Sequence, residues 1–110
     1  MKLPDIPNAI VPEAKITEYL LSLTHRDGRS KARFFTRFGF SADDWKALAN
    51  ALIRHAEEHE VAKIEATQFG VRYVIEGSLN ALDSRTPSVR VVWFISTDET
   101  EPYLVTAYPL

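Results

Sequence analysis

The segment SVRVVWFIS at residues 88–96 decides the fold, because β-branched and aromatic side chains make up most of it. Three segments of similar composition accompany it along the chain: VAKIEAT at 61–67, VRYVIEGSL at 71–79 and YLVTAY at 103–108. Short connections containing Gly, Pro, Asn or Asp separate the four segments. The second half of the chain therefore predicts four strands that form an antiparallel meander.

The first half of the chain has apolar residues at helical spacing instead. We expect a first helix from Pro12 to about Leu23, with Ile16, Tyr19, Leu20 and Leu23 on one apolar face. A second helix is expected over residues 31–38 and a third from Ser41 to about residue 58. Ser30 is expected to cap the second helix and Gly39 to end it, while Ser41 and Asp44 resemble a capping box. Helices followed by a sheet predict an α+β fold with the helices packed on one face.

The helix-facing contacts are expected to come from a set of large apolar residues: Leu20, Phe35, Trp45, Leu48 and Leu52. In the third strand, Val89, Val91, Trp93 and Ile95 should share one face and Arg90, Val92 and Phe94 the other. The second face should then be a cleft or a contact surface.

Composition restricts the class of protein. The 110 residues are enough for one domain over 1–110, with 45% apolar and 25% charged residues. Cysteine is absent, which excludes disulfides and thiolate metal sites and favours a reducing, cytoplasmic location. No apolar stretch reaches the length of a bilayer span, so we expect a soluble protein that does not cross a membrane. Oligomeric state is not predicted.

Basic side chains are concentrated in RDGRSKARFFTR at residues 26–37, although the whole chain has a net charge of −2. The substrate-binding candidates Arg29, Arg33 and Arg37 could hold the phosphates of RNA, with Phe34 and Phe38 stacking on bases. Alternatively, the phenylalanines belong to the core and the arginines form a solvated helix face.

Candidate catalytic residues come from both halves of the chain: His25, Lys31, Arg85, Thr106 and Tyr108. A loop histidine can transfer protons near neutral pH, while lysine and arginine can stabilise charge on a phosphate. Tyr73 is a further candidate for substrate binding. The hypothesis requires Tyr73, Arg85, Thr106 and Tyr108 to converge near His25 or Lys31; otherwise each has an ordinary structural explanation.

His55 and His59 lie four residues apart in HAEEH, a spacing at which two imidazoles can share a metal ion. The segment differs from the HExxH metalloprotease motif because Ala56 occupies the position of the glutamate. We therefore predict no metal and no cofactor.

The residues also carry a family resemblance over nearly the whole chain. His25, Gly28, Lys31 and Ala32 match an H-x-x-G-x-x-K-A core, and the ending from Pro102 to Tyr108 matches P-x-L-V-T-x-Y. Both motifs resemble a bacterial family of unknown function. A more distant, fold-level similarity is to the toxin ribonucleases grouped with barnase, colicin nucleases and RelE-type toxins, which implies RNA cleavage on a sheet.

Two functions remain open from the sequence. The first is a metal-independent endoribonuclease toxin that acts on RNA, with His25 or Tyr108 as the proton carrier and Lys31 and Arg85 stabilising charge. The second is a non-catalytic module, namely an antitoxin, an immunity protein or an accessory domain, whose surface binds a protein partner such as a cognate toxin or antitoxin.

Overall fold

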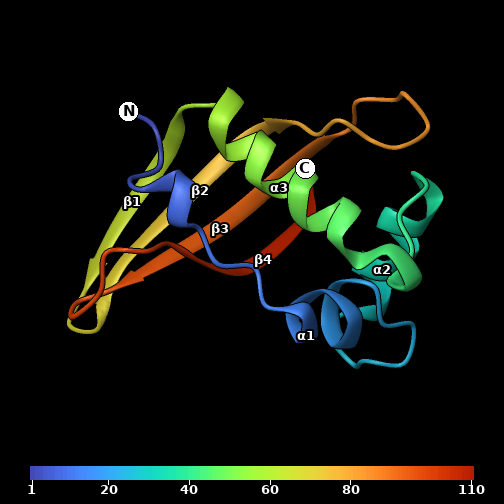
Figure 1. The fold of residues 1–110 in the computed structure, drawn as a ribbon, viewed down its shortest axis with the longest axis horizontal. Coiled ribbons are helices and arrows are strands. Elements are labelled where there is room, and N and C mark those ends of the chain that lie inside the picture. The colour runs from blue at the N-terminus through green and yellow to red at the C-terminus, as the bar shows by residue number, and fades with distance from the viewer.

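The fold is α+β, as predicted, in a computed structural model that describes all 110 residues. The strands are β1 (Val61–Thr67), β2 (Gly70–Ser78), β3 (Ser88–Ser96) and β4 (Tyr103–Pro109). They pair antiparallel in the order β1-β2-β3-β4, which confirms the meander. Figure 1 shows the long helix α3 (Trp45–Glu58) lying across one face of this sheet.

The first helix is shorter and less regular than predicted. It consists of α1 (Glu13–Lys15), which continues as one π-helical segment, η2 (Ile16–Leu20). The amide of Leu21 bonds to the carbonyl of Ile16 at 2.7 Å, which ends the helix before Leu23. The prediction that Leu23 belongs to a buried helix face was wrong, because that side chain is 62% exposed.

The second helix, α2 (Arg29–Arg37), begins two residues before the predicted start. Gly28 occupies its N-cap position and no side chain caps it, so the predicted capping by Ser30 was wrong. Gly39 has a φ of 99°, and this left-handed conformation follows the helix end as predicted.

The third helix is preceded by a short 3-10 turn, η3 (Ala42–Asp44), in place of the predicted capping box. Neither Ser41 nor Asp44 makes a side-chain cap bond. The buried face of α3 includes Leu48, Leu52 and Ala56 as predicted, whereas Trp45 is only half-buried.

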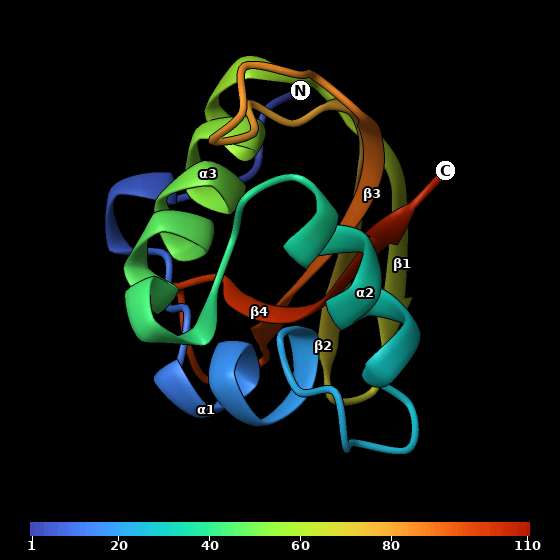
Figure 2. The same ribbon diagram turned by 90° about the vertical axis from the view of Figure 1, so that its right-hand side faces the viewer.

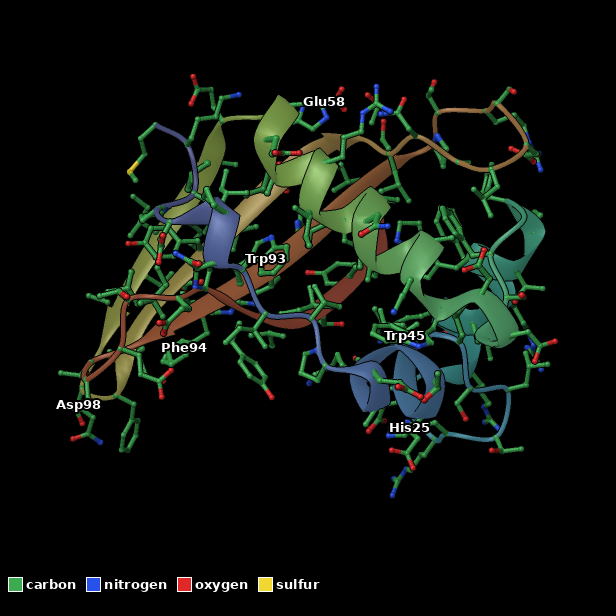
Figure 3. The ribbon with its side chains drawn as sticks, viewed as in Figure 1. His25, Trp45, Glu58, Trp93, Phe94 and Asp98 are labelled. Atoms are coloured by element: carbon green, nitrogen blue, oxygen red, sulfur yellow. The ribbon has the colours of Figure 1, made fainter.

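The sheet has two different faces. On the inner face, which faces α3, Val89, Val91 and Trp93 are fully buried in one core cluster. Trp93 lies on β3 beneath α3 in Figure 3. The outer face carries the alternate residues, including Arg90, and no helix covers it over β1 and β2 (Figure 2). The predicted separation of the two faces of β3 is confirmed.

The N-terminal arm lies beside β4, the last strand of the chain. After the 3-10 turn η1 (Ile6–Asn8), Ile10 forms a parallel bridge with Tyr103 at the edge of β4. The amide of Ile10 bonds to the Pro102 carbonyl at 2.8 Å, and the Leu104 amide bonds to the Ile10 carbonyl at 3.0 Å. This bridge leads the chain directly into α1 beside β4.

None of the helices has both the length and the apolar composition needed to traverse a bilayer.

Candidate functional site

Tyr19 is the centre of the polar cluster that contains several of the predicted residues. It is placed on the π-helical segment η2, and its hydroxyl lies 2.9 Å from Oγ1 of Thr106 on β4. Single π turns inside helices occur frequently at functional sites. The ring of Tyr19 is half-buried, so one part of it packs on the protein and another part faces solvent.

The imidazole of His25 packs against the edge of the Tyr19 ring, with 5.0 Å between centroids. Its Nδ1 accepts the backbone N–H groups of Asp27 at 2.9 Å and Gly28 at 3.0 Å. Both bonds require an unprotonated Nδ1, so the neutral ring carries its proton on Nε2. Nε2 has no hydrogen-bond partner in the chain and can donate to a ligand.

Gly28 lets this loop approach η2 closely. A Cβ at this position would lie 2.1 Å from the backbone oxygen of Tyr19, closer than any contact that real Cβ atoms make. The H-x-x-G spacing therefore has a structural explanation: His25 caps the turn and Gly28 lets it pack on Tyr19. His25 therefore has an ordinary structural role, because its Nδ1 caps this turn.

Two lysines flank the Tyr19 ring. Nζ of Lys31 lies 5.3 Å from the ring centroid and donates to the Asp27 carbonyl at 3.0 Å, while Nζ of Lys15 lies 5.5 Å from the centroid. Both distances are within the range of cation–π attraction. The two ammonium groups leave this cluster positively charged on one side of the hydroxyl pair.

Part of this cluster lines a hollow of about 520 Å³, which we call the Tyr19 hollow. Its lining residues are Ala14, Lys15, Tyr19, His25, Val105 and Thr106. An ammonium group, an imidazole N–H and the one hydroxyl of the bonded pair whose proton is free are all hydrogen-bond donors, and a phosphate oxygen accepts from each of them. The arrangement suits an anionic ligand better than a cationic or a purely apolar one.

Tyr108 lies near this cluster but on the open outer face. It is two residues beyond Thr106 on the same strand, and its hydroxyl accepts a hydrogen bond of 3.3 Å from Arg90. Arg90 also donates through Nε to Glu76 at 2.6 Å. The Tyr108 bond, followed by the one to Glu76, raises the pKa of Arg90 above its usual value.

Tyr73 and Arg85 do not lie near His25 or Lys31, so the predicted convergence of these candidates was wrong. Tyr73 pairs with Trp93 and therefore lies on the inner face, away from Thr106. Arg85 is held at the other end of α2, where it bonds to the Arg37 carbonyl at 2.9 Å and packs over the Phe38 ring at 4.3 Å. An ion pair with Asp83 completes these contacts and lowers the pKa of that carboxyl.

The basic helix α2 combines arginines that face solvent with phenylalanines that pack against the core. Arg29, Arg33 and Arg37 are exposed and make no side-chain ion pair, whereas Phe34 and Phe38 pack against the core. The phenylalanines therefore pack against the core in this structure, and the arginines form a solvated basic face of α2.

The two histidines of HAEEH bind backbone carbonyls. Nε2 of His55 lies 3.1 Å from the Gly77 oxygen, Nε2 of His59 lies 2.8 Å from the Ser78 oxygen, and their rings are 4.7 Å apart. Burial lowers the pKa of His55 to about 4, although the bond to Gly77 opposes this shift. The pair fastens the end of α3 to β2.

Sequence reasoning missed Tyr19, Lys15, Arg90 and Glu76. Tyr19 was assigned to a buried helix face because its spacing fits that face, and nothing local indicates a π turn. Glu76 and Arg90 had a usable signal: opposite charges on neighbouring strands, which the observed register places directly opposite one another.

Comparison with known proteins places the chain in a family and gives its fold a relative. No curated protein matches the chain. A chain of a contact-dependent growth inhibition toxin–immunity protein complex from Klebsiella pneumoniae 342 superposes with a TM-score of 0.74 and 16% sequence identity. That match covers 94% of this chain and 95% of the other, and it shows a shared fold. The model of a domain of unknown function, DUF6883, matches residues 2–110, and the chain belongs to this family.

Proposed function

We propose that this chain is a toxin that cleaves RNA in the Tyr19 hollow through its own side chains. The observation that carries the proposal is the gathering of Lys15, His25 and the bonded Tyr19–Thr106 hydroxyl pair around one open hollow, with the ammonium group of Lys31 close to the Tyr19 ring. The fold shared with a chain of a toxin–immunity protein complex is compatible with a toxin and equally with an immunity protein.

In the proposed reaction, the 2′-hydroxyl of a nucleotide attacks the adjacent phosphorus and the bond to the 5′ oxygen breaks. The products are a 2′,3′-cyclic phosphate and a free 5′-hydroxyl. The proton of the 2′-hydroxyl passes through the Tyr19–Thr106 hydroxyl pair to water, and the leaving oxygen takes its proton from water. Each hydroxyl accepts one proton as it gives up another, so the protein ends the reaction unchanged.

The positive groups act on the phosphate. Lys15 and Lys31 stabilise the negative charge that builds up on its oxygens, and Nε2–H of His25 donates a hydrogen bond to it. His25 is therefore assigned to charge stabilisation, because its Nδ1 already accepts two backbone hydrogen bonds. Tyr108, the alternative proton carrier, lies beyond Thr106 on the outer face and contacts Arg90 instead.

The test is RNA cleavage by purified protein in the presence of EDTA. Tyr19→Phe removes only the hydroxyl and keeps the ring that His25 and the lysines contact, so the fold should be retained. We expect its cleavage rate to fall about 100-fold, within the usual range for a proton-transfer group. Tyr73→Phe is the matched control, since Tyr73 lies on the inner face, and it should cleave at the wild-type rate.

Two results would contradict the proposal. One is intact RNA at high protein concentration with total RNA, transfer RNA and messenger RNA as substrates. The other is a Tyr19→Phe variant that cleaves as fast as the Tyr73→Phe control.

A second candidate function is a protein-binding module of the immunity type. It is supported by two exposed apolar side chains on the β1–β2 hairpin, Phe69 at 71% and Ile64 at 50% exposure. Expression in bacteria separates the two candidates. A toxin should stop growth and lose this effect with Tyr19→Phe, whereas an immunity module should leave growth unchanged.

A further inference from the structure

The outer face of the sheet contains a second hollow, of about 360 Å³, beside the site described above. We call it the outer hollow, and its lining residues come from all four strands: Ala62, Lys63, Arg72, Val74, Glu76, Arg90 and Tyr108. The proposed reaction at the Tyr19 hollow uses none of them.

The floor of the outer hollow is apolar although no helix covers it. Val74 and Val92 face each other across β2 and β3, and they are 5% and 0% exposed. Neither belongs to the core cluster between the sheet and α3. Of the two valines, only Val74 lines the hollow, together with the long side chains of Lys63, Arg72 and Arg90. Side chains of this kind can cover an apolar floor with their stems while their charged ends stay in solvent.

Two arginines at the rim are fixed in position. Arg90 donates to Glu76 through Nε and lies under the hydroxyl of Tyr108, with its guanidinium 5.5 Å from the Tyr108 ring centroid. Arg72 forms an ion pair with Glu65 on the neighbouring strand. Each guanidinium keeps N–H groups that these partners do not use, because arginine has five.

The charge balance of the outer hollow fits one phosphodiester. Three cations, Lys63, Arg72 and Arg90, face two carboxylates, Glu65 and Glu76, which leaves one net positive charge. An arginine held by a carboxylate loses little side-chain freedom when a phosphate binds to its remaining N–H groups. The half-buried ring of Tyr108 provides a stacking surface beside them.

β4 connects this hollow to the Tyr19 hollow. Thr106 lines the Tyr19 hollow and Tyr108 lines the outer hollow. Thr106 pairs with Val92 and Tyr108 with Arg90, so both side chains lie on the outer face. Residues two apart along a strand are separated by about 7 Å. A nucleic acid strand bound at Thr106 therefore reaches the outer hollow with its next nucleotide.

The surface on the other side of the Tyr19 hollow is less suited to a phosphate. A third hollow there shares Lys15 and Val105 with it, and also contains Glu99 and Glu101. One cation against two carboxylates repels a polyanion. The charges thus give a bound strand one favourable direction, from the Tyr19 hollow towards the outer hollow.

We propose that the outer hollow is a nucleotide subsite for single-stranded RNA, in which Arg72 and Arg90 hold a phosphate and Tyr108 stacks on a base. This inference rests on the proposed function, since it concerns the nucleotide next to the one that reacts. It adds the substrate class: a single strand of at least three nucleotides, because the arginines hold the phosphate after the one that reacts and a dinucleotide has only one phosphate. A duplex, whose bases are already stacked on one another, should not bind there.

The experiment measures binding of fluorescent 2′-O-methyl RNA, whose blocked hydroxyl prevents cleavage. Wild type, Arg72→Gln and Arg90→Gln are compared by fluorescence anisotropy with a tetranucleotide and a dinucleotide. Arg54→Gln is the matched control, because Arg54 also forms an exposed ion pair, with Glu58, but lies on α3, which covers the inner face of the sheet. Thermal unfolding checks that each variant is folded, and the double variant Arg90→Gln, Glu76→Gln removes Arg90 without leaving its carboxylate unpaired.

We expect Arg72→Gln and Arg90→Gln to weaken tetranucleotide binding about tenfold, and the slope of log affinity against log salt to fall by about one. Dinucleotide binding and the Arg54→Gln control should stay at the wild-type level. The double variant should bind the tetranucleotide as weakly as Arg90→Gln.

Equal affinity of all variants for the tetranucleotide overturns the subsite, and so does an equal loss for both oligonucleotides. A wild-type protein that binds neither oligonucleotide also overturns it. The proposed function fails separately: if the wild type binds the tetranucleotide in this pattern but cleaves no RNA, the subsite stands and the ribonuclease proposal does not.

Discussion

At the residue scale, His55 is the one ionisable side chain buried in the core, at 1% exposure, and burial holds its pKa at about 4. In the unfolded chain this imidazole has a pKa near 6.5, so between these two values the unfolded state binds a proton that the folded state does not. Its contribution to stability is therefore fully present above pH 6.5 and is lost as the pH falls towards 4.

We expect this residue to cost about 3 kcal/mol of unfolding free energy between pH 7 and pH 4. Urea denaturation at several pH values measures the loss. His55→Gln keeps an N–H donor for the Gly77 carbonyl and cannot titrate, so its stability should change less over this range. Parallel pH profiles for the variant and the wild type would show that other groups cause the acid sensitivity.

At the element scale, the packing of the loop between η2 and α2 depends on Gly28, which has no side chain. Gly28→Ala would place a Cβ 2.1 Å from the backbone oxygen of Tyr19, which cannot move without shifting η2. We expect a loss of about 2 kcal/mol or more in unfolding free energy, together with displacement of the Tyr19 hydroxyl.

Gly77→Ala is the comparison for this prediction. Its Cβ would meet the ring of His59 at 2.6 Å, and that side chain can rotate away at the surface. Urea denaturation of both variants should give a clearly smaller loss for Gly77→Ala. A Gly28→Ala variant that is the more stable of the two would contradict the close packing of the loop on η2.

The elements also show what the sequence could and could not predict. Strand positions and their faces follow from local alternation, and the bounds of β3 agree with the segment 88–96 residue for residue. Helix ends depend on hydrogen bonds that propensity does not specify: at α2 the imidazole of His25 orders the turn, so Ser30 has no role in capping.

The site was less predictable than the fold, for a tertiary reason. His25, Lys31 and Thr106 do lie together, but Tyr19 joins them, and its contact with Thr106 spans 87 positions of sequence. Arg85 looked equally suitable by residue type, yet its partners are Phe38 and the Arg37 carbonyl. Residue type alone does not distinguish these two cases.

At the scale of the whole molecule, the meander separates contacts that form early from contacts that form late. The four strands of the sheet pair with one another in sequence order, whereas the Tyr19–Thr106 bond closes a loop of most of the chain. Contacts between distant positions require more loop-closure entropy and slow folding. We expect hydrogen-exchange labelling during refolding to protect the β2 and β3 amides before the Leu21 amide of η2; simultaneous protection would contradict this order.

The hydrogen bond between Tyr19 and Thr106 can form only when η2 is docked on β4. A chain with a finished sheet but an undocked η2 has no assembled hydroxyl pair and no lysines in place around it. In this predicted order of folding, the proposed reaction starts only after η2 has docked, so incompletely folded molecules should be inert.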